Sequence, residues 1–203
     1  MHNGRVADLE QPVDVLRTYL QRSRDALVWK LDGLSEREVR LPRTRTGTTL
    51  LGIVLHCANV EIGYFGPTFG REWPDTDDPA YLTLDVYDDD PQADWWVPAE
   101  VSTAHLLDFY RRVGAFADAA FDELPLDTLG RVPWWPEERA TTSLHRIAIH
   151  VMSDVARHAG HADVLREEID GATGMLREST NIPDAFDWPG YVARLTAIAD
   201  QFP

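Results

Sequence analysis

The chain has 203 residues, of which 44% are hydrophobic, so it can bury one substantial core and fits a single domain. Nineteen Lys and Arg residues against 34 Asp and Glu residues give a net charge of −15, which disfavours nucleic acids and anionic membranes as partners. Its one cysteine, Cys57, excludes an internal disulfide, and without a signal-peptide pattern or an unbroken apolar run of about 18 residues we expect a cytoplasmic protein.

Apolar residues recur at helical intervals of three and four along most of the chain. This spacing predicts four long helices: Val13 to Gly33, about Thr49 to Gly66, Ser102 or Thr103 to Leu124, and about Thr142 to Asp170. Ser35 to Glu38 forms a capping-box pattern shortly before Pro42, which leaves room for only a short helical turn. Asp187 as a cap and Pro189 in the first turn predict a final short helix.

Two long connections interrupt the helical pattern. Residues 72–100 show no sustained period, and Trp95 and Trp96 near the end of this stretch favour a packed lid over a floppy linker. Its acidic part, Asp75 to Asp90, is expected to be a solvated loop, because its carboxylates do not follow a calcium-loop spacing. The second connection, Gly130 to Thr141, is also expected to be a loop.

Four long amphipathic helices with two sizeable connections predict an all-α four-helix bundle with long crossover loops and a short C-terminal helix. We expect one domain over residues 1–203, with its core at about 9–171 and a C-terminal extension at 172–203. An apolar bundle face left over after packing often pairs with its own copy, so a homodimer is a further expectation.

The segment Asp154-Val-Ala-Arg-His158-Ala-Gly-His161 holds three potential metal ligands at i, i+4 and i+7, on one face of a helix. A carboxylate and an imidazole one turn apart can converge on one ion at about 2.0 to 2.2 Å. Bundle cores build metal sites from facing helices, which makes His56 the candidate for a further ligand. A lone histidine on an apolar face can also be a hydrogen-bonded core residue, so the alternative to coordination stays open.

Two other histidines lie on the same predicted helix. His145 lies nine residues before Asp154, about 180° around the helix, and is expected to face solvent or act as a cap. His150 lies one turn before Asp154 and is either an outer partner of the site or the start of a polar stripe. His161 is either a further metal ligand or a donor that orients one.

The segments Arg157-His-Ala-Gly-His-Ala-Asp-Val-Leu-Arg-Glu-Glu-Ile-Asp-Gly171 and Leu50-Leu-Gly-Ile-Val-Leu-His56 resemble those of the DinB/YfiT-like metalloproteins. Within that superfamily the chain is most similar to an actinobacterial branch, the mycothiol-dependent S-transferases and the N-terminal domain of mycothiol-dependent maleylpyruvate isomerase. The resemblance runs from the first helix through Gly171. Because only about thirty residues follow Gly171, the two-domain isomerase is the less favoured relative.

The resemblance implies a four-helix bundle that binds a divalent metal, usually zinc, through His56, Asp154 and His158. Nickel, iron or manganese would also suit these ligand types. The sequence departs from the family at Asp154, where this branch more often has glutamate and the wider superfamily histidine. A shorter carboxylate leaves His161 as the alternative ligand.

The activity implied is transfer of a low-molecular-weight thiol, such as mycothiol, to a small electrophilic substrate, because a bound dication stabilises thiolate over thiol. Candidate pocket residues are aromatic, as is typical of small-molecule sites: Tyr64, Trp95, Trp134 and Trp135. Two other functions stay open: a metal-dependent hydrolase with His161 as general base, and a non-enzymatic protein that binds a metal or small molecule. A purely structural role for the histidines predicts a protein that folds without metal.

Overall fold

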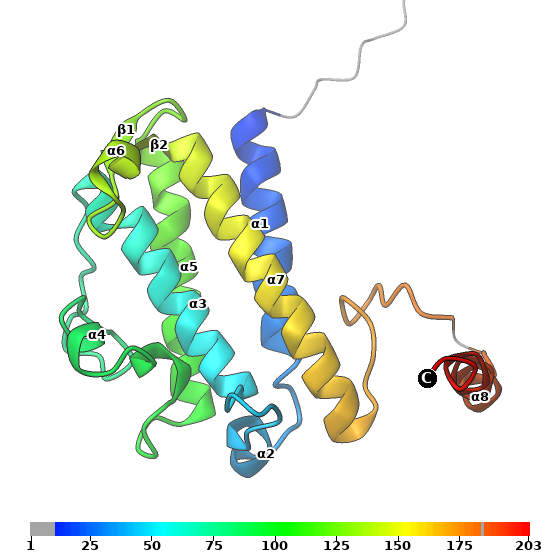
Figure 1. Cartoon of the computed structure of the whole chain (residues 1–203). Helices are drawn as coiled ribbons and strands as arrows, with labels where there is room; N and C mark the ends of the chain where they lie inside the picture. Colours follow the sequence, from blue (N-terminus) through cyan, green and yellow to red (C-terminus); the bar gives the residue numbers. More distant parts are fainter. Residues whose placement is uncertain (1–10, 184) are drawn as a thin grey trace, which may run out of the picture.

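The computed structural model describes residues 11–183 and 185–203, and these form an all-α bundle, as predicted. Its four long helices are α1 (Pro12–Trp29), α3 (Leu50–Phe65), α5 (Thr103–Glu123) and α7 (Leu144–Asp170). Contacts join α1 to α7, α7 to α3, α3 to α5 and α5 to α1, so the helices close a ring around one core (Figure 1). The predicted start of the core at residue 9 lies outside the described residues.

Local capping sets the starts of α3, α5 and α7, which is why the sequence located them well, whereas α1 has no side-chain cap and ends at Trp29, four residues before the predicted stop at Gly33. The side chains of Thr49, Ser102 and Ser143 each accept a hydrogen bond from a backbone N–H in the first turn of α3, α5 and α7. Gly171 ends α7 in the left-handed conformation, with φ of 79°. The predicted capping box of Ser35 and Glu38 is also present and begins the short α2 (Glu36–Arg40).

The connections contain short elements that the apolar pattern did not predict. The first connection carries the 3-10 turns η1 (Pro67–Phe69) and η2 (Ala93–Trp95) and the short α4 (Val86–Asp89). The second, predicted to be only a loop, is closed at its ends by the antiparallel strands β1 (Leu129–Arg131) and β2 (Thr141–Ser143), with α6 (Glu137–Ala140) between them. Three-residue strands are too short to show a period of two, so the sequence pattern did not predict them.

The prediction that the acidic segment is a solvated loop was wrong for Asp78, which is buried. Its carboxylate accepts hydrogen bonds from Arg112 Nη2 at 2.6 Å and from the backbone N–H of Ala80 at 2.9 Å, and lies 2.9 Å from His105 Nε2. These contacts hold the pKa of Asp78 below its usual value, although burial acts in the opposite direction. The first connection is therefore anchored to α5, because the Asp78 carboxylate contacts His105 and Arg112, which are 27 and 34 residues away in the sequence.

Helix α3 is the central helix of the bundle. The stretch Leu50–Phe69 is long and apolar enough to qualify as a membrane span by composition, but 72% of it is buried among the other helices. Thirteen of the sixteen residues of α3 are buried, since α5 packs on one side and α7 on the other. Its hydropathy is accounted for by its place in the core.

The last helix, α8 (Trp188–Ala199), contributes nothing to this core. None of its residues is buried, and it lies apart from the four long helices (Figure 1). Removing residues 188–203 should therefore leave the thermal midpoint within about 2 °C of the full chain, because burial supplies most folding free energy. Differential scanning calorimetry of the two chains checks this, and a loss of more than about 5 °C would show that α8 is part of the folding unit.

Candidate metal centre

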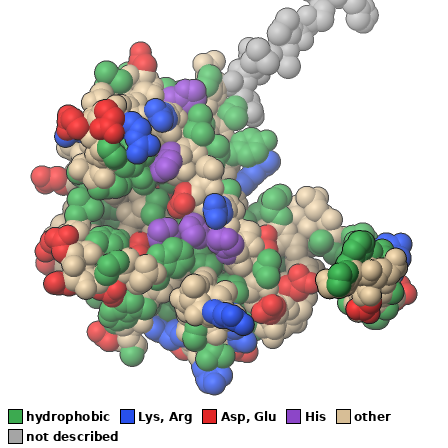
Figure 2. Space-filling model, viewed as in Figure 1, with side chains coloured by type: hydrophobic (Ala, Val, Ile, Leu, Met, Phe, Trp, Pro, Cys, Tyr) green, Lys and Arg blue, Asp and Glu red, His purple; other side chains and the backbone are tan. Residues whose placement is uncertain are grey.

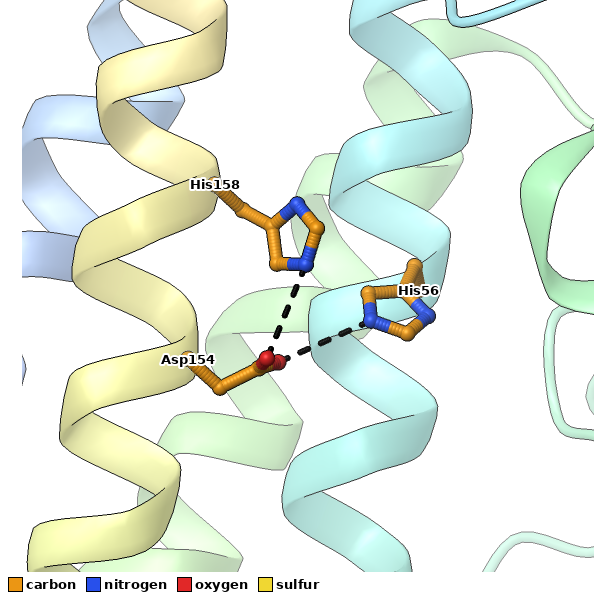
Figure 3. A group of neighbouring side chains, drawn as sticks. All are labelled: His56, Asp154 and His158. Carbon is orange, nitrogen blue, oxygen red and sulfur yellow. Dashed lines mark ion pairs between the residues drawn. The ribbon is translucent and has the colours of Figure 1, made fainter. Parts of the chain in front are cut away.

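Helices α3 and α7 bring His56, Asp154 and His158 together (Figure 3). His56 Nε2 lies 3.6 Å from Asp154 Oδ2, and His158 Nε2 lies 3.7 Å from Asp154 Oδ1. One ligand atom from each residue lies within 4.8 Å of the other two. Asp154 and His158 are one turn apart on α7, as the sequence predicted, and His56 reaches them from the facing helix.

The residues present fit a divalent ion. Two donors that each lie about 2.1 Å from a tetrahedral ion are about 3.4 Å apart. The two separations in the structure, 3.6 and 3.7 Å, are close to this value. Asp154 Oδ2 is buried and has no hydrogen-bond partner, an arrangement that costs free energy unless a cation or donor satisfies the oxygen. Two imidazoles and one carboxylate are also a donor set that suits catalytic zinc.

The electrostatics of the three residues also favour a bound cation. Burial lowers the pKa of His56, but the carboxylates of Asp154 and Asp94 outweigh it and raise that pKa to about 9. Burial, followed by the charge on His56, lowers the pKa of His158 to about 4. Burial raises the pKa of Asp154, but His56 and His158 together bring it below its usual value. The cluster therefore holds an anionic carboxylate that favours one positive charge between the two helices.

Asp94, which no sequence pattern predicted, is placed to orient His56. Its Oδ2 lies 2.7 Å from His56 Nδ1, so Nδ1–H can donate a hydrogen bond to the carboxylate, which leaves Nε2, on the side of Asp154, as the nitrogen available to a metal ion. Asp94 is 38 residues from His56 in an acidic connection without a pattern. The one signal beside it was Trp95, whose indole stacks on the His56 ring with centroids 4.3 Å apart.

The backbone of η2 reaches His56 because α3 has a glycine one turn earlier. A Cβ on Gly52 would lie 2.1 Å from the carbonyl oxygen of Trp95, which no side chain could tolerate. The close approach places both Asp94 and Trp95 against His56. Trp95 is thus a wall of the candidate metal centre, with its ring centroid also 5.2 Å from that of His158.

The other candidate residues divide between this centre and a neighbouring aromatic cluster. His161 Nδ1 lies 3.4 Å from His158 Nδ1, on the side of that ring away from Asp154, which suits a residue that orients His158. Tyr64 and its neighbours form the aromatic cluster: His150 Nε2 is 3.1 Å from the Tyr64 hydroxyl, and Trp135 Nε1 donates to it at 3.1 Å. Trp134 lies edge-on to Tyr64.

The remaining histidine of α7 and the cysteine take no part in the centre. His145 is exposed, as expected. Cys57 is fully buried, and burial raises the pKa of its thiol well above the usual value, so it is a packing residue. Figure 2 shows histidine side chains gathered in the middle of the face that α3 and α7 present.

A sequence profile of the family described as mycothiol-S-transferase matches residues 15–171, from the first turn of α1 to the end of α7. The chain belongs to this family. The family is DinB-like, which confirms the resemblance seen in the sequence. The matched region contains every residue of the candidate metal centre and leaves α8 outside.

The solved structures support the fold of this family member. A crystal structure titled as the conserved protein of a locus from Enterococcus faecalis superimposes with a TM-score of 0.64 at 15% identity. The match covers 81% of this chain and 100% of that one. No curated protein matches the sequence significantly.

Replacing Asp94 by alanine should weaken metal binding about 10- to 100-fold, because His56 then loses the group that fixes its tautomer and ring orientation. Asp89→Ala, an exposed carboxylate of the same connection, is the matched control and should leave affinity unchanged. Competition with a chromophoric zinc chelator measures both. Equal affinities for the two variants would show that Asp94 does not support the site.

Proposed function

We propose that this protein is a divalent-metal-dependent transferase that joins mycothiol, or a closely similar low-molecular-weight thiol, to a small electrophilic substrate. The observation that carries the proposal is the convergence of His56, Asp154 and His158 in a member of the mycothiol S-transferase family. Zinc is the proposed ion. Catalytic zinc sites typically have three protein ligands, drawn from imidazole nitrogens and carboxylate oxygens, and keep a fourth position that water or substrate can occupy.

In this proposal His56 and His158 would hold one ion through Nε2, and Asp154 would hold it through its buried oxygen. A bound dication supplies the positive charge that favours the thiolate form of a thiol at neutral pH. The protein's own contribution is orientation. Asp94 accepts a hydrogen bond from His56 Nδ1–H, and His161 faces Nδ1 of His158, so each imidazole would use Nε2 for the metal ion.

Trp95 forms an apolar wall beside the two histidines. Its indole stacks on the His56 ring and lies edge-on to the His158 ring. Lower local polarity strengthens the attraction between a cation and an anionic sulfur. Asp154 partly offsets the charge of a dication, so the site favours thiolate without binding anions indiscriminately.

The test compares protein stripped by a chelator with the same protein reloaded with zinc. Mycothiol and an electrophile such as monobromobimane are added, and the thioether product is followed by mass spectrometry. We expect the enzymatic rate only with zinc, and the uncatalysed rate after stripping. Zinc-dependent hydrolysis of a test ester without thiol would favour the hydrolase instead, and bound zinc with no turnover of either kind would favour a binding protein.

A further inference from the structure

A cavity with a volume of about 560 Å³ lies along helix α3, and its lining begins at Asn59, three residues after His56. Helix α3, the connection around α4 and the loop between β1 and α6 supply its walls. The lining is dominated by apolar and aromatic side chains, among them Val60, Tyr64, Leu82, Leu84, Tyr87 and Trp134. This size and lining are typical of sites for small organic molecules.

The cavity opens along the same face of α3 that carries His56. Val60 is four residues and Gly63 seven residues after His56, so all three share one face, and Val60 lies about 6 Å along the helix axis from His56. Two further links join cavity and centre. Tyr64 contacts His150, one turn before Asp154 on α7, and burial together with the neighbouring Asp94 raises the pKa of Tyr87.

The walls of the cavity are held in place by specific contacts. Asn59 donates to the carbonyl of Ala80 at 3.1 Å and accepts from the N–H of Leu82 at 2.9 Å, which fastens one wall to α3. On the opposite wall Trp134 rests on Gly63, where an added Cβ would lie 3.0 Å from the indole ring. The cavity is therefore part of the folded scaffold and does not need a ligand to form.

Charge decides which molecules such a cavity accepts. Among the described residues that line it, Asp88 alone is formally charged, and it is exposed. No Lys, Arg or His belongs to this lining, so an anionic ligand would find no counter-charge, and the net charge of −15 disfavours its approach. The amide of Asn59 already has partners on both its nitrogen and its oxygen, so it has little left for a polyhydroxylated ligand.

We propose that this cavity binds the electrophilic co-substrate and selects uncharged, flat, apolar molecules such as activated aromatic halides over anionic electrophiles. The proposal rests on the thiol-transfer function above. With 1-chloro-2,4-dinitrobenzene as the acceptor, the thiolate sulfur forms a bond to the ring carbon that carries chlorine. The carbon–chlorine bond then breaks, chloride leaves with the electron pair, and the proton of the thiol has gone to water.

The first test measures binding to the zinc-loaded full chain with two fluorescent probes of similar shape. N-phenyl-1-naphthylamine is uncharged, and 8-anilinonaphthalene-1-sulfonate is anionic. We expect the uncharged probe to bind more tightly and to be displaced by 1-chloro-2,4-dinitrobenzene but not by iodoacetate. Equal binding of both probes would overturn the selectivity, and displacement by mycothiol alone would assign the cavity to the thiol and overturn the proposal.

Leu84→Glu tests the location, because Leu84 is a half-exposed wall residue whose replacement does not disturb the core. It should weaken binding of the uncharged probe about tenfold, through lost apolar contact and an added charge. Val164→Glu places the same charge at an exposed position of α7 outside the cavity and should have no effect. Unchanged affinity in Leu84→Glu would contradict the assignment.

Zinc content and probe binding are measured on the same samples, so a failure of the thiol-transfer proposal can be distinguished from a failure of the cavity proposal. A protein that binds the uncharged probe as expected but neither retains zinc nor forms the thioether would lose the transferase function. A protein that forms the thioether equally fast with iodoacetamide and with iodoacetate, at matched chemical reactivity, would keep that function and lose the selective cavity.

Discussion

Alanine at His158 or at His56 should abolish stoichiometric metal binding and thiol transfer together. Each substitution removes one of three converging donors, and two donors on a single helix or across two helices hold a divalent ion at least about 100-fold more weakly than three. Elemental analysis of the purified proteins, with zinc added in small excess and then removed by gel filtration, measures the loss.

His145→Ala is the matched control. It removes an imidazole from the same helix α7, but from an exposed position on the other side, and should keep about one ion per chain. Circular dichroism and the thermal midpoint of the metal-free variants show whether folding is retained. A His158→Ala protein that still copurifies with as much zinc as wild type would remove the metal centre from these residues.

Asp154 and His161 can be separated by the same measurement. The geometry places Asp154 between His56 and His158, whereas His161 contacts the far nitrogen of His158. Asp154→Ala should therefore resemble His158→Ala, while His161→Ala should reduce affinity only about 10- to 100-fold. The reverse order would make His161 the ligand that replaces the glutamate more usual in this branch.

Glu61→Ala should be strongly destabilising. Glu61 is fully buried on α3, where its carboxylate accepts hydrogen bonds from Arg24 of α1 and from the Tyr110 hydroxyl of α5. Without it a buried guanidinium loses its main counter-charge, and removing one partner of such a pair costs about 3 to 5 kcal/mol. Urea unfolding monitored by circular dichroism measures the free energy of unfolding.

Two comparisons make that result specific. Glu137→Ala breaks an exposed ion pair with Arg131 and should leave the free energy of unfolding unchanged within error. The double variant Arg24→Met/Glu61→Leu removes both charges and fills the space, so it should be more stable than Glu61→Ala. If the single and double variants are equally unstable, the loss comes from packing and not from the uncompensated charge.

The sequence by itself determined the helices and the pairing of two of the three residues of the candidate metal centre. Apolar spacing and the caps Thr49, Ser102 and Ser143 are local properties, and local interactions define where an amphipathic helix begins and which side it buries. Asp154 and His158 could be paired on one face for the same reason, since one turn of helix separates them. His56 was a candidate because bundle cores build metal sites from facing helices, and the resemblance to a known family then selected it, since no local spacing joins it to α7.

Only the tertiary structure decided what surrounds these residues. Asp94 reaches His56 because Gly52 lets a distant connection approach α3, and Asp78 is buried because α5 offers Arg112 and His105. Such contacts depend on which segments meet after the bundle closes. The sequence of an acidic loop has the same pattern whether its carboxylates face water or a buried partner. The periodicity of a chain encodes its helices, whereas the polar contacts between connections and helices exist only once those helices are packed.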